Sequence, residues 1–129
     1  METKDLAGFE AVCSLADLVP DVPHVVQVRG HEIAVIRTCG SIFAILNECS
    51  HADVVLDQGE VSDCHIECWL HGSRFNLRTG EPDSLPAIRS VPVYGVRLST
   101  DGADAEVLVN PDADPHRSGF PIDPLEANQ

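Results

Sequence analysis

The sequence predicts an antiparallel all-β domain into which a segment rich in cysteine and histidine is inserted. Across residues 9–109, short runs of β-branched residues alternate with Gly, Pro, Asn or Asp, a pattern typical of such domains. The chain has 129 residues, 43% of them hydrophobic and 22% charged, which suits one globule that folds around its own core without disulfides. We therefore expect residues 1–110 to form the domain.

The predicted strands follow one another in hairpins. They are expected at residues 25–28, 31–37, 42–46, 91–98 and 106–109. In the second strand, Ile33, Val35 and Arg37 alternate with Ala34 and Ile36, so that the two sets face opposite ways. The third strand is apolar throughout, which predicts burial of both of its faces.

Residues 47–90 and 111–129 depart from this strand pattern. Strands are only fragmentary in residues 47–90, which we expect to be an insertion built around something other than an apolar core. It contains six potential metal ligands: Cys49, His51, Cys64, His65, Cys68 and His71. Closely spaced prolines and acidic residues fill residues 111–129, which predicts an extended or disordered tail.

The charge balance bears on possible partners. The formal net charge is −13, which repels nucleic-acid phosphates and anionic lipid headgroups and attracts a basic protein surface. No apolar run is long enough to span a bilayer, and the first residues do not resemble a signal peptide. We therefore expect a cytoplasmic protein without a nucleic-acid or membrane partner, and cysteines that are ligands, nucleophiles or core residues rather than disulfide partners.

Two short motifs carry the chemistry. Cys49 and His51 are separated by one residue, Cys68 and His71 by two, and 16 residues lie between the motifs. A structural zinc site usually pairs cysteine with cysteine and histidine with histidine, whereas each motif here supplies one of each. A [2Fe–2S] cluster with two thiolates on one iron and two imidazoles on the other needs this mixture. Its oxidised form is then neutral overall, which lowers the cost of burying it.

At these motifs the sequence resembles the Rieske iron–sulfur family. The resemblance continues through residues 72–80 and 85–87, and it extends over roughly residues 9–110. It implies a Rieske-type antiparallel β-sandwich in which residues 47–90 form an inserted cluster-binding subdomain.

The resemblance also implies the ligand set for one [2Fe–2S] cluster per chain. Cys49 and Cys68 would bind one iron, and His51 and His71 the other. The loop containing Pro86 would cover the cluster from a third side.

Departures from the family pattern bear on the reduction potential. High-potential Rieske proteins carry two further cysteines joined by a disulfide, where this chain has Val54 and Leu70. Ser73 matches a serine that donates a hydrogen bond to the cluster, but Phe75 replaces a tyrosine that donates another. Losing one donor lowers the potential. Gly72 has no Cβ, which allows backbone amides to approach the cluster sulfurs.

The chain is therefore similar to soluble Rieske ferredoxins, which carry electrons and are not enzymes themselves. Such a protein would pass single electrons from a flavin-dependent reductase to a terminal non-haem iron oxygenase. The length leaves no room for the mononuclear-iron domain of an oxygenase. Related carriers serve iron–sulfur cluster assembly or nitrite reductases. A structural zinc-binding module remains the alternative of another class, and loss of all metal binding is disfavoured because every ligand position is filled.

Several residues near the motifs have open roles. Trp69 is interpreted either as an exposed docking residue or as a hydrophobic lid over the cluster. Four acidic residues form either a docking surface or merely solvated loops: Asp53, Asp57, Glu60 and Asp63. Cys64 and His65 offer a disfavoured alternative ligand set, while Cys13 and Cys39 are expected to be core or turn residues.

Overall fold

The computed structural model describes residues 8–48, 54–69, 72–83, 91–100, 104–111 and 120–121. Ten strands and one short 3-10 turn occur in these ranges: β1 (Glu10–Ser14), η1 (Leu15–Asp17), β2 (His24–Val28), β3 (His31–Thr38), β4 (Ser41–Leu46), β5 (Val61–Ser62), β6 (His65–Glu67), β7 (Arg74–Asn76), β8 (Val93–Leu98), β9 (Glu106–Asn110) and β10 (Phe120–Pro121). None of the helical structure described is long and apolar enough to cross a membrane.

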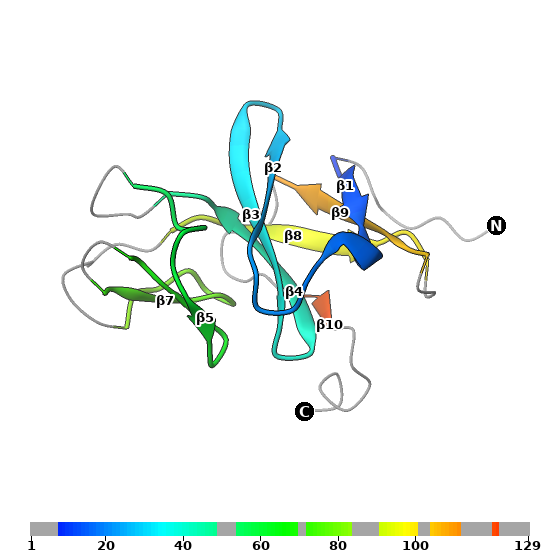
Figure 1. Cartoon of the computed structure of the whole chain (residues 1–129). Helices are drawn as coiled ribbons and strands as arrows, with labels where there is room; N and C mark the ends of the chain where they lie inside the picture. Colours follow the sequence, from blue (N-terminus) through cyan, green and yellow to red (C-terminus); the bar gives the residue numbers. More distant parts are fainter. Residues whose placement is uncertain are drawn as a thin grey trace.

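The strands form two antiparallel sheets. The main sheet has the order β1-β9-β8-β4-β3-β2, with β10 paired to β4, and its edge strands β1 and β2 contact each other, so the sheet curls. The second sheet, β5-β6-β7, lies at one side of the main sheet, beside β3 and β4 (Figure 1). The predicted all-β class with an inserted segment is confirmed.

Strands β3 and β4 are buried on both faces. Ile33 and Val35 pack into the core inside the curled main sheet. Ala34 and Ile36 point the other way, into a second core shared with the β5-β6-β7 sheet. In β4, alternate residues divide between the same two cores. The alternation predicted from the sequence is therefore confirmed, with hydrophobic neighbours on both sides instead of solvent on one.

The insertion contributes apolar side chains to the core that it shares with β3 and β4, contrary to expectation. Ile66 of β6 pairs with Phe75 of β7, and both are fully buried together with Leu56 and Leu77 against the β3–β4 face. Burying each such side chain stabilises the fold by about 1.5–3 kcal/mol. Ile66 and Phe75 are single buried residues in very short strands, and Leu56 and Leu77 lie outside the strands, so no periodic pattern revealed them. Cys68, the described member of the two metal motifs, thus belongs to a subdomain that packs on the main sheet.

The segment after residue 110 contributes one described contact. Phe120 pairs with Ile42, and Pro121 with Ser41, so this piece adds an edge to β4. Residues 112–119 and 122–129 lie outside the described residues. The boundary of the tail and its extended or disordered state remain predictions.

Candidate metal centre

One of the four predicted ligands lies in the described part of the chain. Cys49, His51 and His71 fall outside it, as does Pro86. Among the described residues no three potential ligands gather around a metal position. The ligand set therefore stays a prediction, and Cys68 is the member whose surroundings can be tested.

Cys68 has the surroundings expected of a thiolate ligand. Its thiol is free and fully buried at the end of β6, in the core that contains Ile66 and Phe75. The backbone N–H of Cys68 donates to the carbonyl of Ser73 at 2.7 Å, and the N–H of Gly72 donates to the carbonyl of Cys68 at 2.9 Å. These bonds close a tight turn between residues 68 and 73. A free thiol, fixed in position and shielded on its inner side by apolar side chains, suits the thiolate position of an iron–sulfur cluster.

The backbone conformation gives a reason for glycine at position 72 besides the one expected. Gly72 has a φ of +79°, a left-handed conformation that L side chains rarely adopt. Among the described atoms, an added Cβ would meet only Oε2 of Glu67, at an ordinary 3.6 Å. The backbone conformation of the turn is therefore enough to require glycine. The expected approach of amides to cluster sulfurs stays a prediction.

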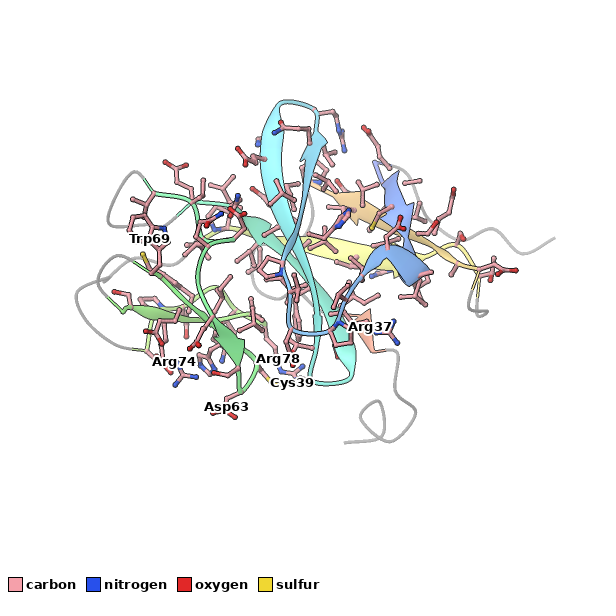
Figure 2. All side chains as sticks on the ribbon, in the orientation of Figure 1. Arg37, Cys39, Asp63, Trp69, Arg74 and Arg78 are labelled. Carbon is pink, nitrogen blue, oxygen red and sulfur yellow. A yellow bond between two sulfur atoms is a disulfide. The ribbon has the colours of Figure 1, made fainter. Side chains whose placement is uncertain are left out.

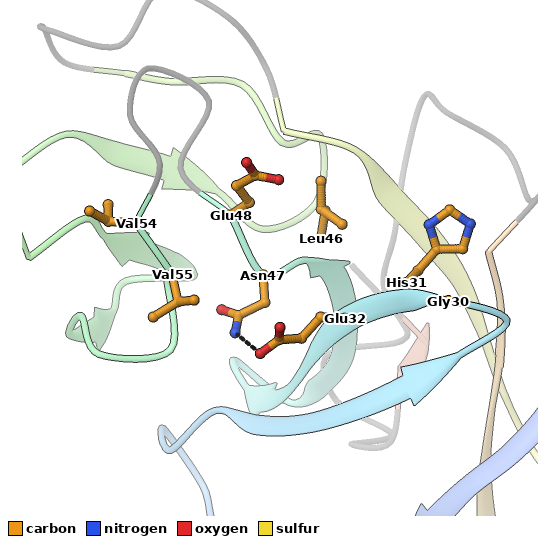
Figure 3. Close-up of a pocket in the computed structure, with 8 residues that line it drawn as sticks. All are labelled: Gly30, His31, Glu32, Leu46, Asn47, Glu48, Val54 and Val55. Atoms are coloured by element: carbon orange, nitrogen blue, oxygen red, sulfur yellow. Dashed lines mark hydrogen bonds between the residues drawn. The ribbon is translucent and has the colours of Figure 1, made fainter.

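The first ligand loop is closed at its base by Asn47, which sequence reasoning missed. Oδ1 of Asn47 accepts hydrogen bonds from the backbone N–H groups of Leu56 at 3.0 Å and Asp57 at 2.8 Å. Nδ2 donates to Oδ1 of Asp57 at 2.9 Å and to Oε2 of Glu32 at 3.2 Å (Figure 3). The side chain is 3% exposed, and its amide uses its full hydrogen-bonding capacity. It therefore joins the two ends of residues 48–55, the segment that contains Cys49 and His51.

The hydrogen bonds of Asn47 act as a clamp on the first ligand loop. A hollow of about 380 Å³ lies beside this clamp, between the β2–β3 turn and the start of the loop (Figure 3). Its lining consists of Gly30, His31, Glu32, Leu46, Asn47, Glu48, Val54 and Val55. Glu32 and Glu48 place negative charge at the base of the loop. The only sequence signal for Asn47 was a polar residue directly after an apolar strand, which many turns share.

The third loop is held at its start by His65. Its Nε2 lies 3.0 Å from Oδ2 of Asp83, and its Nδ1 lies 2.6 Å from the carbonyl oxygen of Asp63. Asp83 directly precedes residues 84–90, which contain Pro86. Both ring nitrogens thus have protein partners. His65 acts as a link between β6 and this loop, which argues against the alternative ligand set.

Cys39 and Cys64 form a disulfide, which corrects the expectation that the cysteines are ligands, nucleophiles or core residues rather than disulfide partners. The Cα atoms are 5.7 Å apart. Cys39 lies in the β3–β4 turn and Cys64 in the β5–β6 turn, both with positive φ. The two turns meet because the second sheet packs on β3 and β4. The residues are 25 positions apart in turns of different sheets, so no local pattern could have paired them.

The remaining predicted site residues differ in exposure. Ser73 and Phe75 are fully buried, and Phe75 shares the apolar core with Cys68. Trp69 is 52% exposed, directly after Cys68 (Figure 2). Of the acidic residues, Asp57 is tied to Asn47, and Oδ2 of Asp63 lies 4.0 Å from Nη2 of Arg74. Glu60 is exposed, and Asp53 lies outside the described residues.

Comparison with known proteins adds independent evidence. The family model for the Rieske [2Fe–2S] domain matches residues 8–95. The ferredoxin component of biphenyl 2,3-dioxygenase from Rhodococcus jostii strain RHA1 is 36% identical over 99 residues, covering 77% of this chain and 89% of that protein.

Solved structures show the same fold. The ferredoxin of carbazole 1,9a-dioxygenase from Nocardioides aromaticivorans IC177 has 40% identity and a TM-score of 0.71, with 81% of this chain and 98% of that chain covered. A chain in the complex of reduced oxygenase and oxidised ferredoxin of carbazole 1,9a-dioxygenase has 28% identity and a TM-score of 0.71, with 83% and 96% covered.

Proposed function

The chain belongs to the Rieske [2Fe–2S] domain family, and we therefore propose that it carries single electrons from a flavin-dependent reductase to a terminal non-haem iron oxygenase. One observation supports the proposal above all. The thiol of Cys68 is free and buried, in a closed turn inside the segment that the family model matches. When bound, a cluster of this type accepts and returns one electron. The chain itself would be an electron-transfer component and not a catalyst.

The residues of the chain would divide the work of holding that group. Cys49 and Cys68 would supply thiolates to one iron, and His51 and His71 would supply neutral imidazoles to the other. Asn47 fixes the first ligand loop at its base, and the hydrogen bonds between residues 68 and 73 fix the second. Apolar side chains around Cys68 exclude water from its inner side. Fixed ligands and a shielded thiolate keep the reorganisation that accompanies electron transfer small.

The proposed partners follow from the relatives and from the surface. Ferredoxin components of dioxygenase systems are among the relatives, and one structural neighbour comes from an oxygenase–ferredoxin complex. Trp69 supports docking near the second ligand loop, because an indole that is 52% exposed can be covered by a partner. Its exposure favours the docking role over the lid. The net charge of −13 favours a basic docking face on each partner.

Metal analysis tests the proposal directly. The purified protein should be red-brown and contain two iron and two acid-labile sulfide per chain. Reduction with dithionite should give a rhombic spin-one-half signal with the low average g value expected when imidazoles bind the reducible iron. Stoichiometric zinc without sulfide would instead support a structural zinc module.

Electron uptake should depend on salt. We expect the second-order rate constant for reduction by a dioxygenase-system reductase to fall by about tenfold or more as the Debye length shrinks from about 10 Å at 0.1 M salt to about 3 Å at 1 M. The reason is that an acidic carrier is steered toward a basic face by long-range attraction. Stopped-flow reduction at several salt concentrations measures this. A constant rate would mean that the charge does not steer the encounter.

Phe75→Tyr should raise the reduction potential. The wild-type value is expected in the lower half of the roughly −150 to +300 mV range of Rieske centres. A tyrosine hydroxyl that donates to a ligand sulfur favours the reduced state by about 1 kcal/mol, equivalent to about 40 mV for one electron. Spectroelectrochemical titration of both proteins measures the shift. A tyrosine that donates this bond yet lowers the potential would contradict the argument.

A further inference from the structure

The disulfide between Cys39 and Cys64 connects the two sheets. Cys39 lies at the end of the β3–β4 hairpin, whereas Trp69, which marks the second ligand loop, lies at another edge of the insertion (Figure 2). The Cα separation of 5.7 Å is ordinary for a disulfide. Both cysteines are half-buried, so small solutes can reach them. Cys68, in contrast, is fully buried.

We propose that Cys39 and Cys64 are a reversible thiol–disulfide pair, a second redox centre that locks the insertion onto the main sheet when oxidised. In the reducing compartment expected from the sequence, disulfides are usually transient or redox-sensing. The part of the proposal in which the disulfide helps the protein to retain its cluster rests on the proposed function. The reversible formation of the disulfide does not.

The cross-link restrains a segment that supports two of the loops predicted to surround the cluster. These are the second ligand loop, which follows Cys68, and the third loop, which contains Pro86. The carbonyl of Cys64 accepts a hydrogen bond from the N–H of Leu77 at 3.0 Å, which ties its turn to the end of β7. The next residue, His65, contacts Asp83 at the start of the third loop. Without the disulfide, the β3–β4 and β5–β6 turns are held together by packing, including the contact of the Arg78 guanidinium, 5.5 Å from the centre of the Phe43 ring. Opening the cross-link therefore loosens the support beneath the second and third loops.

Charged residues of both signs lie around the pair. Arg37 precedes Cys39 by two residues, and Nη2 of Arg74 donates to the carbonyl of Ser62 at 3.3 Å, next to the Cys64 turn. Figure 2 places both arginines, with Arg78, on the same side of the molecule as Cys39. Asp63, next to Cys64, lies on that side too, with its Oδ2 4.0 Å from Nη2 of Arg74. Oxidised glutathione is a small disulfide whose carboxylates these arginines can contact.

The protein disulfide forms by thiol–disulfide exchange in two steps. One protein thiolate attacks the small disulfide, forming a mixed disulfide and releasing one small thiol. The second protein thiolate then attacks the protein sulfur of that mixed disulfide and releases the second small thiol. The two protein sulfurs lose two electrons in total, and the released thiols carry these electrons and the two protons. Reduced glutathione reverses both steps.

Disulfide mapping tests the chemistry. The cluster-loaded protein is equilibrated without oxygen in mixtures of reduced and oxidised glutathione, quenched with acid, alkylated under denaturing conditions and digested for mass spectrometry. We expect the Cys39–Cys64 peptide to form and disappear reversibly while Cys13 is alkylated in every sample. Burial, with Asp17 nearby, raises the pKa of Cys13 to about 11, so its protonated thiol reacts slowly in the native protein. Two unlinked thiols in excess oxidised glutathione, or a link that reduced glutathione leaves intact, would overturn the proposal.

The rate at which iron and sulfide are released at raised temperature tests whether the disulfide holds the insertion on the main sheet. We expect about tenfold faster release from the reduced pair than from the disulfide form. Cys39→Ser should release at the fast rate in either glutathione mixture, and Cys13→Ser should respond like the wild type. Equal release from both wild-type forms would overturn the lock. If the protein holds zinc instead of a cluster, the proposed function fails. Disulfide mapping then still shows whether Cys39 and Cys64 form a reversible disulfide.

Discussion

Cys68→Ser should leave the protein without its cluster, with neither iron nor acid-labile sulfide above background. Serine offers a neutral hydroxyl, a poor ligand for ferric iron beside thiolate. The thiol that it replaces is fully buried and free, so no surface cysteine can take its place without moving the turn between residues 68 and 73. Iron and sulfide assays on freshly purified protein, with the visible spectrum, measure the loss.

Cys13→Ser is the matched control for this experiment. It makes the same change at Cys13, the other free cysteine in the described part of the chain, which lies in β1 outside the insertion, and should retain full iron and sulfide. Cys49→Ser should behave like Cys68→Ser, since the resemblance places both thiolates on one iron. Full iron and sulfide in both ligand variants would show that the predicted cysteines are not the ligands.

Asn47→Ala should lower the free energy of unfolding by about 3 kcal/mol and make the cluster labile. The substitution removes four hydrogen bonds, and it leaves the buried N–H of Leu56 without its acceptor. It also releases the two ends of residues 48–55, which contain Cys49 and His51. Denaturant unfolding measures the first effect, and the rate of iron release at fixed temperature measures the second.

Gln58→Ala provides the comparison for Asn47→Ala. Gln58 is exposed in the same loop, and its described hydrogen bond is a 3.3 Å contact with Oδ2 of the adjacent Asp57. Its removal should change the unfolding free energy by less than about 0.5 kcal/mol and leave iron release unchanged. An Asn47→Ala protein that holds iron as firmly as the wild type would show that the first loop does not depend on this clamp.

Much of the fold could be predicted because local physics determines it. Alternation of apolar residues gave β3, and a fully apolar run gave β4, since strand side chains point to opposite faces. The Arg29-Gly30 turn between β2 and β3 is also a local signal. The ligand motifs were visible because metal chemistry restricts both residue type and spacing. In each case the information lay within a few neighbouring residues.

The missed features depend on contacts between distant segments. The Cys39–Cys64 bond needs two turns from different sheets to meet, and the role of Asn47 needs residues 56 and 57 to return to the end of β4. The contribution of the insertion to the shared core was missed because Ile66 and Phe75 are single buried residues in three-residue strands. A sequence pattern records neighbours along the chain, and these contacts appear only when the chain has folded.

Because β3 and β4 contribute to both cores, the insertion is not an interchangeable module. Removing residues 47–90 would uncover five buried apolar side chains of the main sheet: Ala34, Ile36, Phe43, Ile45 and Val93. An exposed apolar surface of this kind promotes aggregation. The metal-binding half and the scaffold should therefore melt in a single cooperative transition, and a shortened scaffold would need polar replacements on that face before it could exist as a monomer.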